Sequence, residues 1–304
     1  MSRVVIKRRL ILTAIGIVVG FPLLLILGGA TWYALYDRTN GSIVSSGETR
    51  DYLVYVPEGY DAARPTPLVI SLHGTALWPA LQRDISGWNG IADEQGFIVI
   101  YPGALGRPQR KWRLSFKPGA GDLLEVRYVS DLIDSLDETY NIDTARIYVD
   151  GLSAGGIMAL ALACQLPHRF AAVAAVAAAL PKGYCDDPQP VPLIAFHGTA
   201  DPLYPFEGGE TWAISEPVES VSTWISGRVR QNECDPAPLE IKESTDVLRR
   251  EYRGCAARLV QYVIEGGGHQ WPGGMQFPEW LAGPPARSID ATSVIWRFFA
   301  DEQL

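Results

Sequence analysis

The stretch Tyr148–Gly156, "YVDGLSAGG", places a serine between two glycines in the pattern Gly-x-Ser-x-Gly. It continues the strand-like residues "RIYV" and precedes an Ala- and Leu-rich run that is typical of a helix. Glycines two residues before and after Ser153 indicate a turn too tight for side chains, which would hold the serine out at the end of a strand. A plain structural turn is the alternative interpretation.

Short apolar runs closed by glycine or proline alternate with helical patterns along most of the chain. The predicted strands are 50–57, 67–74, 96–103, 146–150, 191–198 and 258–264, and the predicted helices are 85–95, 125–140, 154–164, 218–229 and 291–301. Near-continuous apolar strands are typical of a parallel sheet that is buried on both faces. Strands that alternate with helices imply right-handed crossovers between parallel neighbours. The sequence therefore predicts an α/β fold with a mostly parallel central sheet and helices on both faces.

Polar residues follow several of these strands where they end. Ser153 follows one strand, Asp201 lies three residues beyond "FHG", and His269 follows a triple-glycine loop. The carboxyl ends of parallel strands meet at one edge of a sheet, so these three residues can form one site. They predict a nucleophile, Ser153, a general base, His269, and an acid, Asp201, which orients the imidazole. His197 ends an apolar strand, and we expect it to serve packing or hydrogen bonding.

Two backbone N–H groups are candidates for an oxyanion hole, which stabilises the negative oxygen of a tetrahedral intermediate. One belongs to Ala154, at the N-terminus of the predicted helix. The other belongs to Thr75, in the loop that follows the strand "LVISL". Trp271 and Trp212 are candidate substrate contacts, with packing in the core as the alternative. No metal or cofactor is expected.

The first 36 residues differ from the rest of the chain, because Arg3, Lys7, Arg8 and Arg9 precede the uncharged run Leu10–Tyr36. As a helix, this run would be about 40 Å long, enough to cross a ~30 Å hydrocarbon layer. The basic flank places the following residues outside the cytoplasm. We predict a membrane anchor over 1–36, with a cleaved signal segment or a buried core helix as alternatives, a linker over 37–49 and a catalytic domain over 50–304.

Charge and cysteine content restrict the function further. Acidic residues outnumber basic ones by 34 to 26, which argues against nucleic acid or anionic lipid as a partner. All four cysteines lie beyond the apolar run, as expected in an oxidising compartment, and they lack the CxxC spacing of metal or dithiol sites. Proximity in sequence favours the disulfides Cys164–Cys185 and Cys234–Cys255, and four free buried thiols are the alternative.

The stretches "LVISLHGT", "YVDGLSAGGIMALALAC", "FHGTADPLYPFEGG" and "GGGHQWPGG" also resemble a known family. They are similar to single-domain α/β-hydrolases grouped with polyhydroxybutyrate depolymerases and feruloyl or acetylxylan esterases. The resemblance extends over about Arg50–Phe299 and places the family's nucleophile, acid and base at Ser153, Asp201 and His269. It implies the α/β-hydrolase fold, ester hydrolysis through an acyl-enzyme and the same cysteine pairing. Asp150 departs from the small or neutral residue usual in this family.

The sequence thus predicts an extracytoplasmic serine esterase that acts on a small ester, a polyester or a polysaccharide ester. A serine peptidase of the same fold is disfavoured, because no propeller or large lid domain precedes the hydrolase part. A non-catalytic envelope protein that uses the fold for binding would be expected to have a broken set of catalytic residues, whereas here each residue type is present. The identity of the acyl group and the oligomeric state are left open.

Overall fold

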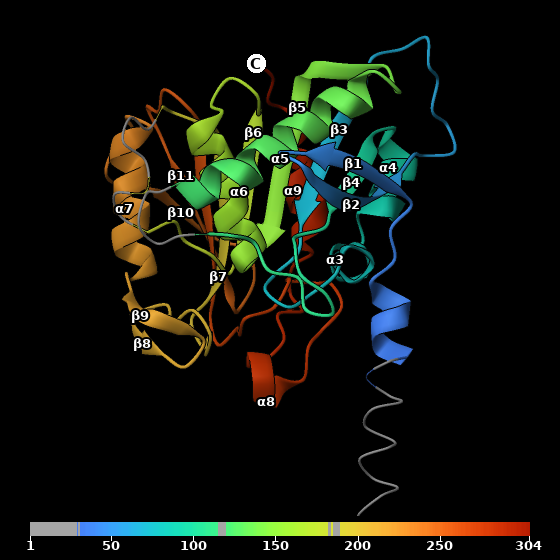
Figure 1. Cartoon of the computed structure of the whole chain (residues 1–304). Helices are drawn as coiled ribbons and strands as arrows, with labels where there is room; N and C mark the ends of the chain where they lie inside the picture. Colours follow the sequence, from blue (N-terminus) through green and yellow to red (C-terminus); the bar gives the residue numbers. More distant parts are fainter. Residues whose placement is uncertain (1–28, 30, 115–119, 182–183, 185–188) are drawn as a thin grey trace, which may run out of the picture.

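The computed structural model of the chain describes residues 29, 31–114, 120–181, 184 and 189–304. Across these residues a ten-stranded sheet has the order β1-β2-β4-β3-β5-β6-β7-β12-β11-β10, and β8 and β9 form a separate hairpin (Figure 1). The strands are β1 (Gly41–Ser45), β2 (Glu48–Tyr55), β3 (Thr66–Leu72), β4 (Ile98–Pro102), β5 (Ile142–Leu152), β6 (Ala172–Val176), β7 (Leu193–Gly198), β8 (Gly209–Thr211), β9 (Ile214–Val218), β10 (Leu239–Lys242), β11 (Val247–Tyr252) and β12 (Leu259–Ile264).

The sheet is mixed but mostly parallel, as predicted. From β4 through β3, β5, β6 and β7 to β12, each strand pairs in parallel with the next. Antiparallel strands extend both edges, with β1 and β2 beyond β4 and with β11 and β10 beyond β12. The carboxyl ends of the central strands therefore lie at one edge.

Helices cover both faces of the sheet. They are α3 (Pro79–Ser86), α4 (Trp88–Gln95), α5 (Ala120–Asp137), α6 (Ala154–Gln165), α7 (Val221–Gln231), α8 (Glu279–Ala282) and α9 (Ala291–Ala300). Residues of α5, α6 and α7 pack into one apolar core, and residues of α3, α4 and α9 pack into the other. Because side chains alternate along a strand, Leu68 and Ile70 of β3 enter the first core and Val69 enters the second.

Two predictions of local structure are wrong, and the central strand β6 was not predicted. The helix predicted over 85–95 is two helices, α3 and α4, because Gly87 between them has a left-handed φ of 68°. The linker predicted over 37–49 contains β1, which pairs with β2 along Gly41–Ser45. The alanine-rich strand β6 has no counterpart among the predicted strands, since alanine favours helices and only burial between β5 and β7 makes "AVAAV" a strand.

The predicted membrane segment lies almost wholly outside the described residues. Residues 31–36 are helical, and in Figure 1 they lie on the same side of the molecule as α8 and the β8–β9 hairpin, below the carboxyl ends of the central strands. In the part of the chain that the structure describes, no helix has the length and apolar character needed to cross a membrane.

Candidate active site

Ser153 lies at a strained turn between β5 and α6. Its φ of 57° and ψ of −123° are outside the regions that residues with a side chain normally adopt. Two backbone hydrogen bonds hold the turn: the Ser153 N–H donates to the Val176 carbonyl at 2.9 Å, and the Ile157 N–H donates to the Ser153 carbonyl at 2.9 Å. A Cβ atom at Gly155 would lie only 2.0 Å from the Leu72 carbonyl oxygen, so this position requires glycine. The turn thus has the predicted strand–serine–helix geometry.

Asp201 and His269 are brought together from the loops after β7 and β12. The His269 Nδ1 atom lies 2.8 Å from Asp201 Oδ2, and both side chains are buried. Asp201 Oδ1 accepts hydrogen bonds from the N–H groups of Leu203 and Tyr204, each at 2.8 Å. The carboxylate is therefore fixed by its own loop while its second oxygen faces the imidazole. A carboxylate on Nδ1 leaves Nε2 as the nitrogen that can accept a proton.

The electrostatic surroundings keep Asp201 ionised. Burial raises the pKa of Asp201, but the neighbouring His269 and His197 outweigh burial and hold this pKa well below its ordinary value. His197 is buried, and its Nε2 atom lies 2.8 Å from the Tyr204 carbonyl oxygen and 3.4 Å from Asp201 Oδ2. His197 thus supports the acid through hydrogen bonding, which agrees with its predicted role.

The loop that carries His269 is held by the segment around α8. The His269 N–H donates to the Ala282 carbonyl at 2.6 Å. The side chain of Gln270 donates to the carbonyls of Phe277 and Gly283 and accepts from the Phe277 N–H at 2.9 Å. These contacts fix a glycine-rich loop that would otherwise be free to move.

The two predicted oxyanion donors belong to two segments that approach each other near Ser153. Ala154 is the first residue of α6, so its N–H has no carbonyl partner four residues earlier within the helix. The loop of Thr75 packs against the turn, since a Cβ atom at Gly74 would lie 3.5 Å from the Ser153 Cβ atom. Thr75 itself is exposed. The assignment of these two N–H groups to an oxyanion hole stays a prediction.

His73, which had no role in the sequence prediction, is fully buried at the base of the Thr75 loop. Burial lowers the pKa of His73 to about 4, so the ring is neutral at pH 7. Its Nε2 atom accepts from the Ala104 N–H at 3.1 Å, so Nδ1 carries the proton and donates to the Gly74 carbonyl at 2.8 Å. The sequence feature that could have indicated this buried histidine is the His-Gly pair at the end of the apolar run of β3.

Asp150 is also buried, on the side of β5 that faces α3 and α4. Its Oδ1 atom accepts from the Ser71 hydroxyl at 2.6 Å, and Ser71 in turn accepts from the Gln82 amide at 3.0 Å. Burial raises the pKa of Asp150 to about 8, although the hydrogen bond from Ser71 opposes the shift. Asp150 is therefore a neutral carboxylic acid at pH 7, and it packs beneath the serine turn as an uncharged group.

The two tryptophans predicted to contact substrate have different surroundings. Trp271 has no exposed surface, and its indole N–H donates to the Thr292 hydroxyl at 2.9 Å. Trp271 is therefore a core residue rather than a substrate contact. Trp212 is 73% exposed on the β8–β9 hairpin. A pocket of about 250 Å³ lies between this hairpin and the loop of Asp201, lined by Pro181, Tyr204 and residues 214 and 216–219.

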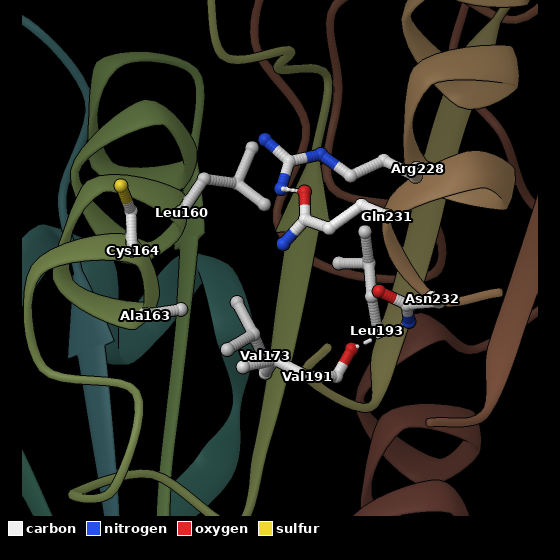
Figure 2. Close-up of a pocket in the computed structure, with 9 residues that line it drawn as sticks. All are labelled: Leu160, Ala163, Cys164, Val173, Val191, Leu193, Arg228, Gln231 and Asn232. Atoms are coloured by element: carbon white, nitrogen blue, oxygen red, sulfur yellow. Dashed lines mark hydrogen bonds between the residues drawn. The ribbon is translucent and has the colours of Figure 1, made fainter. Parts of the chain in front are cut away.

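A second cavity lies far from this site. In Figure 2, Arg228 and Gln231 of α7 point toward α6, and the apolar side chains of Val173 and Leu193 also line the cavity. Val173 and Leu193 are at the beginnings of β6 and β7, whereas the candidate site follows the ends of the strands. The cavity volume of about 10 Å³ is at the lower limit for one water molecule, so it is a packing defect rather than a substrate site.

Cys234 and Cys255 form a disulfide, as predicted. Cys185 lies outside the described residues, so its pairing with Cys164 stays a prediction. No described cysteine is a free thiol.

Comparison with known proteins identifies the family to which the chain belongs. Residues 50–181 match the family model described as Esterase PHB depolymerase. The protein named "Putative esterase NocK" of Nocardia uniformis subsp. tsuyamanensis is 31% identical over 261 residues, which cover 78% of this chain and 74% of the relative. The chain belongs to the PHB depolymerase family of esterases. It is therefore an enzyme that hydrolyses carboxylic esters.

Other relatives of this esterase agree with that assignment. Feruloyl esterase C of Emericella nidulans is 28% identical over 238 residues, which cover 76% of this chain and 79% of the relative. Among solved structures, the acetyl xylan esterase from Aspergillus awamori has a TM-score of 0.55 at 16% identity and covers 73% of this chain and 89% of its own. At that identity the likeness shows the fold alone, and it confirms the predicted α/β-hydrolase fold.

Proposed function

We propose that this esterase works through an acyl-enzyme on Ser153, with His269 as general base and Asp201 as the acid that orients it. The observation that carries the proposal is the 2.8 Å contact between His269 Nδ1 and the buried carboxylate of Asp201. It lies at the same edge of the sheet as Ser153, whose backbone is held in a strained turn. Strain of this kind gathers at active sites.

The proposed reaction has two halves. The Ser153 hydroxyl attacks the ester carbonyl carbon while His269 Nε2 takes its proton, and the ionised Asp201 stabilises the imidazolium. The tetrahedral intermediate collapses, the alcohol leaves with the proton from His269, and an acyl-serine remains. Water then attacks the acyl-serine in the same way and releases the carboxylic acid and the free serine.

The negative oxygen of each tetrahedral intermediate would face the N–H groups of Ala154 and Thr75. Such preorganised donors strengthen their interaction as the charge develops, which lowers the barrier rather than tightening substrate binding. The contact of Gly74 with the serine turn supports this arrangement.

For the substrate, we propose an ester with an aromatic or polymeric part that contacts Trp212. The support is the 73% exposed indole on the β8–β9 hairpin, whose residues 214 and 216–218 line the 250 Å³ pocket, together with a relative named feruloyl esterase C. Rates on a panel of acetyl, hydroxybutyryl-oligomer and feruloyl esters test this. Trp212→Ala should slow the preferred ester more than p-nitrophenyl acetate, and equal slowing of all esters would contradict it.

We also propose that the catalytic domain lies outside the cytoplasm, anchored or exported through residues 1–36. The support is the Cys234–Cys255 disulfide and the uncharged run Leu10–Tyr36 behind four basic residues. Protease added to the outer face of intact cells should digest the domain, and a soluble cytoplasmic pool with the intact N-terminus would contradict this location.

Ser153→Ala tests the catalytic assignment. The turnover of p-nitrophenyl acetate should fall by about a million-fold, and His269→Ala or the double variant should cost about as much, because the residues act as a unit. Ser226→Ala, at an exposed serine of α7, is the matched control and should keep the wild-type rate. Retention of wild-type activity by folded Ser153→Ala protein would refute the proposal.

A further inference from the structure

The loop that carries Thr75 is joined to the loop that follows the neighbouring strand β4. At its base, the His73 carbonyl accepts from the Trp112 indole N–H at 2.8 Å, and the His73 ring accepts from the Ala104 N–H. Further along, the Ala76 N–H donates to the Arg110 carbonyl at 2.8 Å. The direction of the Thr75 N–H therefore depends on where the β4 loop lies.

Ala76 is the point at which this dependence is strongest. It directly follows Thr75 and has a left-handed φ of 60°, a conformation that a residue with a side chain keeps only when its surroundings impose it. The hydrogen bond from the Ala76 N–H to the Arg110 carbonyl can impose this backbone conformation. Movement of Arg110 would release Ala76 and reorient the peptide group before it.

Arg110 is itself fixed through a buried guanidinium group. Only 4% of its side chain is exposed, and its Nε atom donates to Asp37 Oδ1 at 2.6 Å. Its remaining nitrogens donate to the Ala104 carbonyl at 3.0 Å and to Asp51 Oδ2 at 3.2 Å. A buried guanidinium that loses its closest carboxylate must move or draw in water, because an uncompensated buried charge is costly.

Asp37 supplies that carboxylate from the N-terminal side of the domain. Its side chain is 2% exposed, and its Oδ2 atom forms an ion pair with Arg107 Nε at 3.2 Å. The backbone N–H of Asp37 also donates to the carbonyl of Tyr33, in the helical residues 31–36, at 2.8 Å. Asp37 thus connects the end of the N-terminal segment to the loop after β4.

We propose that Asp37, acting through Arg110, is a positioning residue that sets the oxyanion N–H of Thr75. This inference rests on the proposed function, in which Thr75 is an oxyanion donor. Its consequence is that the N-terminal segment and the catalytic site are mechanically coupled, because the residue that ends the segment at 31–36 holds the loop that receives the negative oxygen.

A misplaced oxyanion donor affects the transition state more than the bound substrate. Complete removal of one donor costs about 10²–10³ in turnover. We expect Asp37→Ala and Arg110→Gln each to lower kcat by about tenfold or more with KM changed by less than about twofold. Because the two residues form one unit, the double variant should lose no more than the worse single variant.

The experiment uses the full chain in detergent, with p-nitrophenyl acetate as substrate and phenylboronic acid as inhibitor. The boronic acid forms an anionic tetrahedral adduct with the serine, so its inhibition constant should rise by the same factor as kcat falls. The matched control is Asp143→Ala, which removes a carboxylate that lies 2.6 Å from the Nε atom of Arg146. Asp143 is at the amino end of β5, whereas Ser153 follows the carboxyl end of that strand. Thermal unfolding establishes that each variant is folded at the assay temperature.

The outcomes separate this inference from the proposed function. Lower kcat with weaker boronic acid inhibition in Asp37→Ala, but not in Asp143→Ala, supports it. Unchanged kcat and inhibition in folded Asp37→Ala, with Ser153→Ala inactive, overturns the inference alone. Equal losses in Asp37→Ala and Asp143→Ala also overturn it, since they would reflect general destabilisation. Activity in Ser153→Ala would overturn the proposed function and this inference with it.

Discussion

Alanine at Gly155 should unfold the serine turn, although the same substitution is favourable in most helices. Gly155 is the second residue of α6, and an added Cβ atom would lie 2.0 Å from the Leu72 carbonyl oxygen and 2.7 Å from the His73 carbonyl oxygen. Carbon–oxygen contacts normally begin near ~3.3 Å, so α6 would have to move about 1 Å or more away from β3. Overpacking of this kind typically lowers the free energy of unfolding by about 1–3 kcal/mol. We expect a value of about 3 kcal/mol here, because the contact is with the backbone of a central strand, which cannot easily move.

A second glycine provides the control for that prediction. Gly90 lies in α4, has no left-handed φ, and an added Cβ atom would meet nothing within 4 Å. Gly90→Ala should therefore stabilise the domain by up to about 1 kcal/mol through helix propensity alone. Urea unfolding followed by tryptophan fluorescence measures both changes. Gly155→Ala should also lose about 10²-fold in turnover, because Ser153 is displaced by about 1 Å. A Gly155→Ala protein as stable and active as wild type would refute the close approach of α6 to β3.

Three other substitutions test different parts of the molecule. Asp201→Asn should keep the fold but stabilise the wrong imidazole tautomer, and kcat should fall about 10⁴-fold; a loss below about tenfold would contradict the role of Asp201. Asp150 keeps its proton to about pH 8 when folded but releases it near its ordinary value of 3.8 when unfolded. The free energy of unfolding of wild type relative to Asp150→Asn should therefore fall as the pH rises from about 4 to about 8, by at most about 1.4 kcal/mol per pH unit, and level off above pH 8. Urea unfolding measures this difference, and a difference that does not change with pH would exclude a buried neutral acid. Replacing Cys234 and Cys255 by serine opens a loop with a sequence separation of 21 and should cost about 3 kcal/mol, which a reduced wild-type control should match.

The central sheet and the serine turn could be predicted from the sequence because their signals are local. The run "LVISL" of β3 is apolar throughout since both of its faces are buried, and Gly155 is required by a close backbone approach. Asp201 and His269 follow strand ends, and parallel strand ends meet whatever the rest of the chain does. Their positions after strand ends are therefore enough to identify Asp201 and His269 as candidate site residues from the sequence.

Other features depend on contacts between distant segments and leave no local signal. Strand β6 is a strand because it lies between β5 and β7, not because of its alanines. Trp271 beside the histidine looked like a substrate contact, but its side chain points into the core, where Thr292 accepts its N–H. Asp37 and Arg110 are ordinary charged residues in sequence, and only the fold places both in a buried ion pair.

Backbone strain is the feature that joins these observations. The adjacent strands β3, β5 and β6 are each followed closely by a non-glycine residue with a left-handed φ: Ala76 at 60°, Ser153 at 57° and Ala177 at 51°. Each such residue costs about 1–3 kcal/mol and has no sequence signature, because alanine and serine adopt this conformation only when it is imposed. In each case the backbone N–H donates to a carbonyl of a neighbouring segment, which imposes the conformation: Ala76 to Arg110, Ser153 to Val176 and Ala177 to Phe196. The stability of the central sheet is thus used to hold the three strand ends around the nucleophile in conformations that the isolated segments would not keep. The positions of Ser153 and of the Thr75 loop therefore belong to the folded sheet as a whole rather than to the motif that first reveals them.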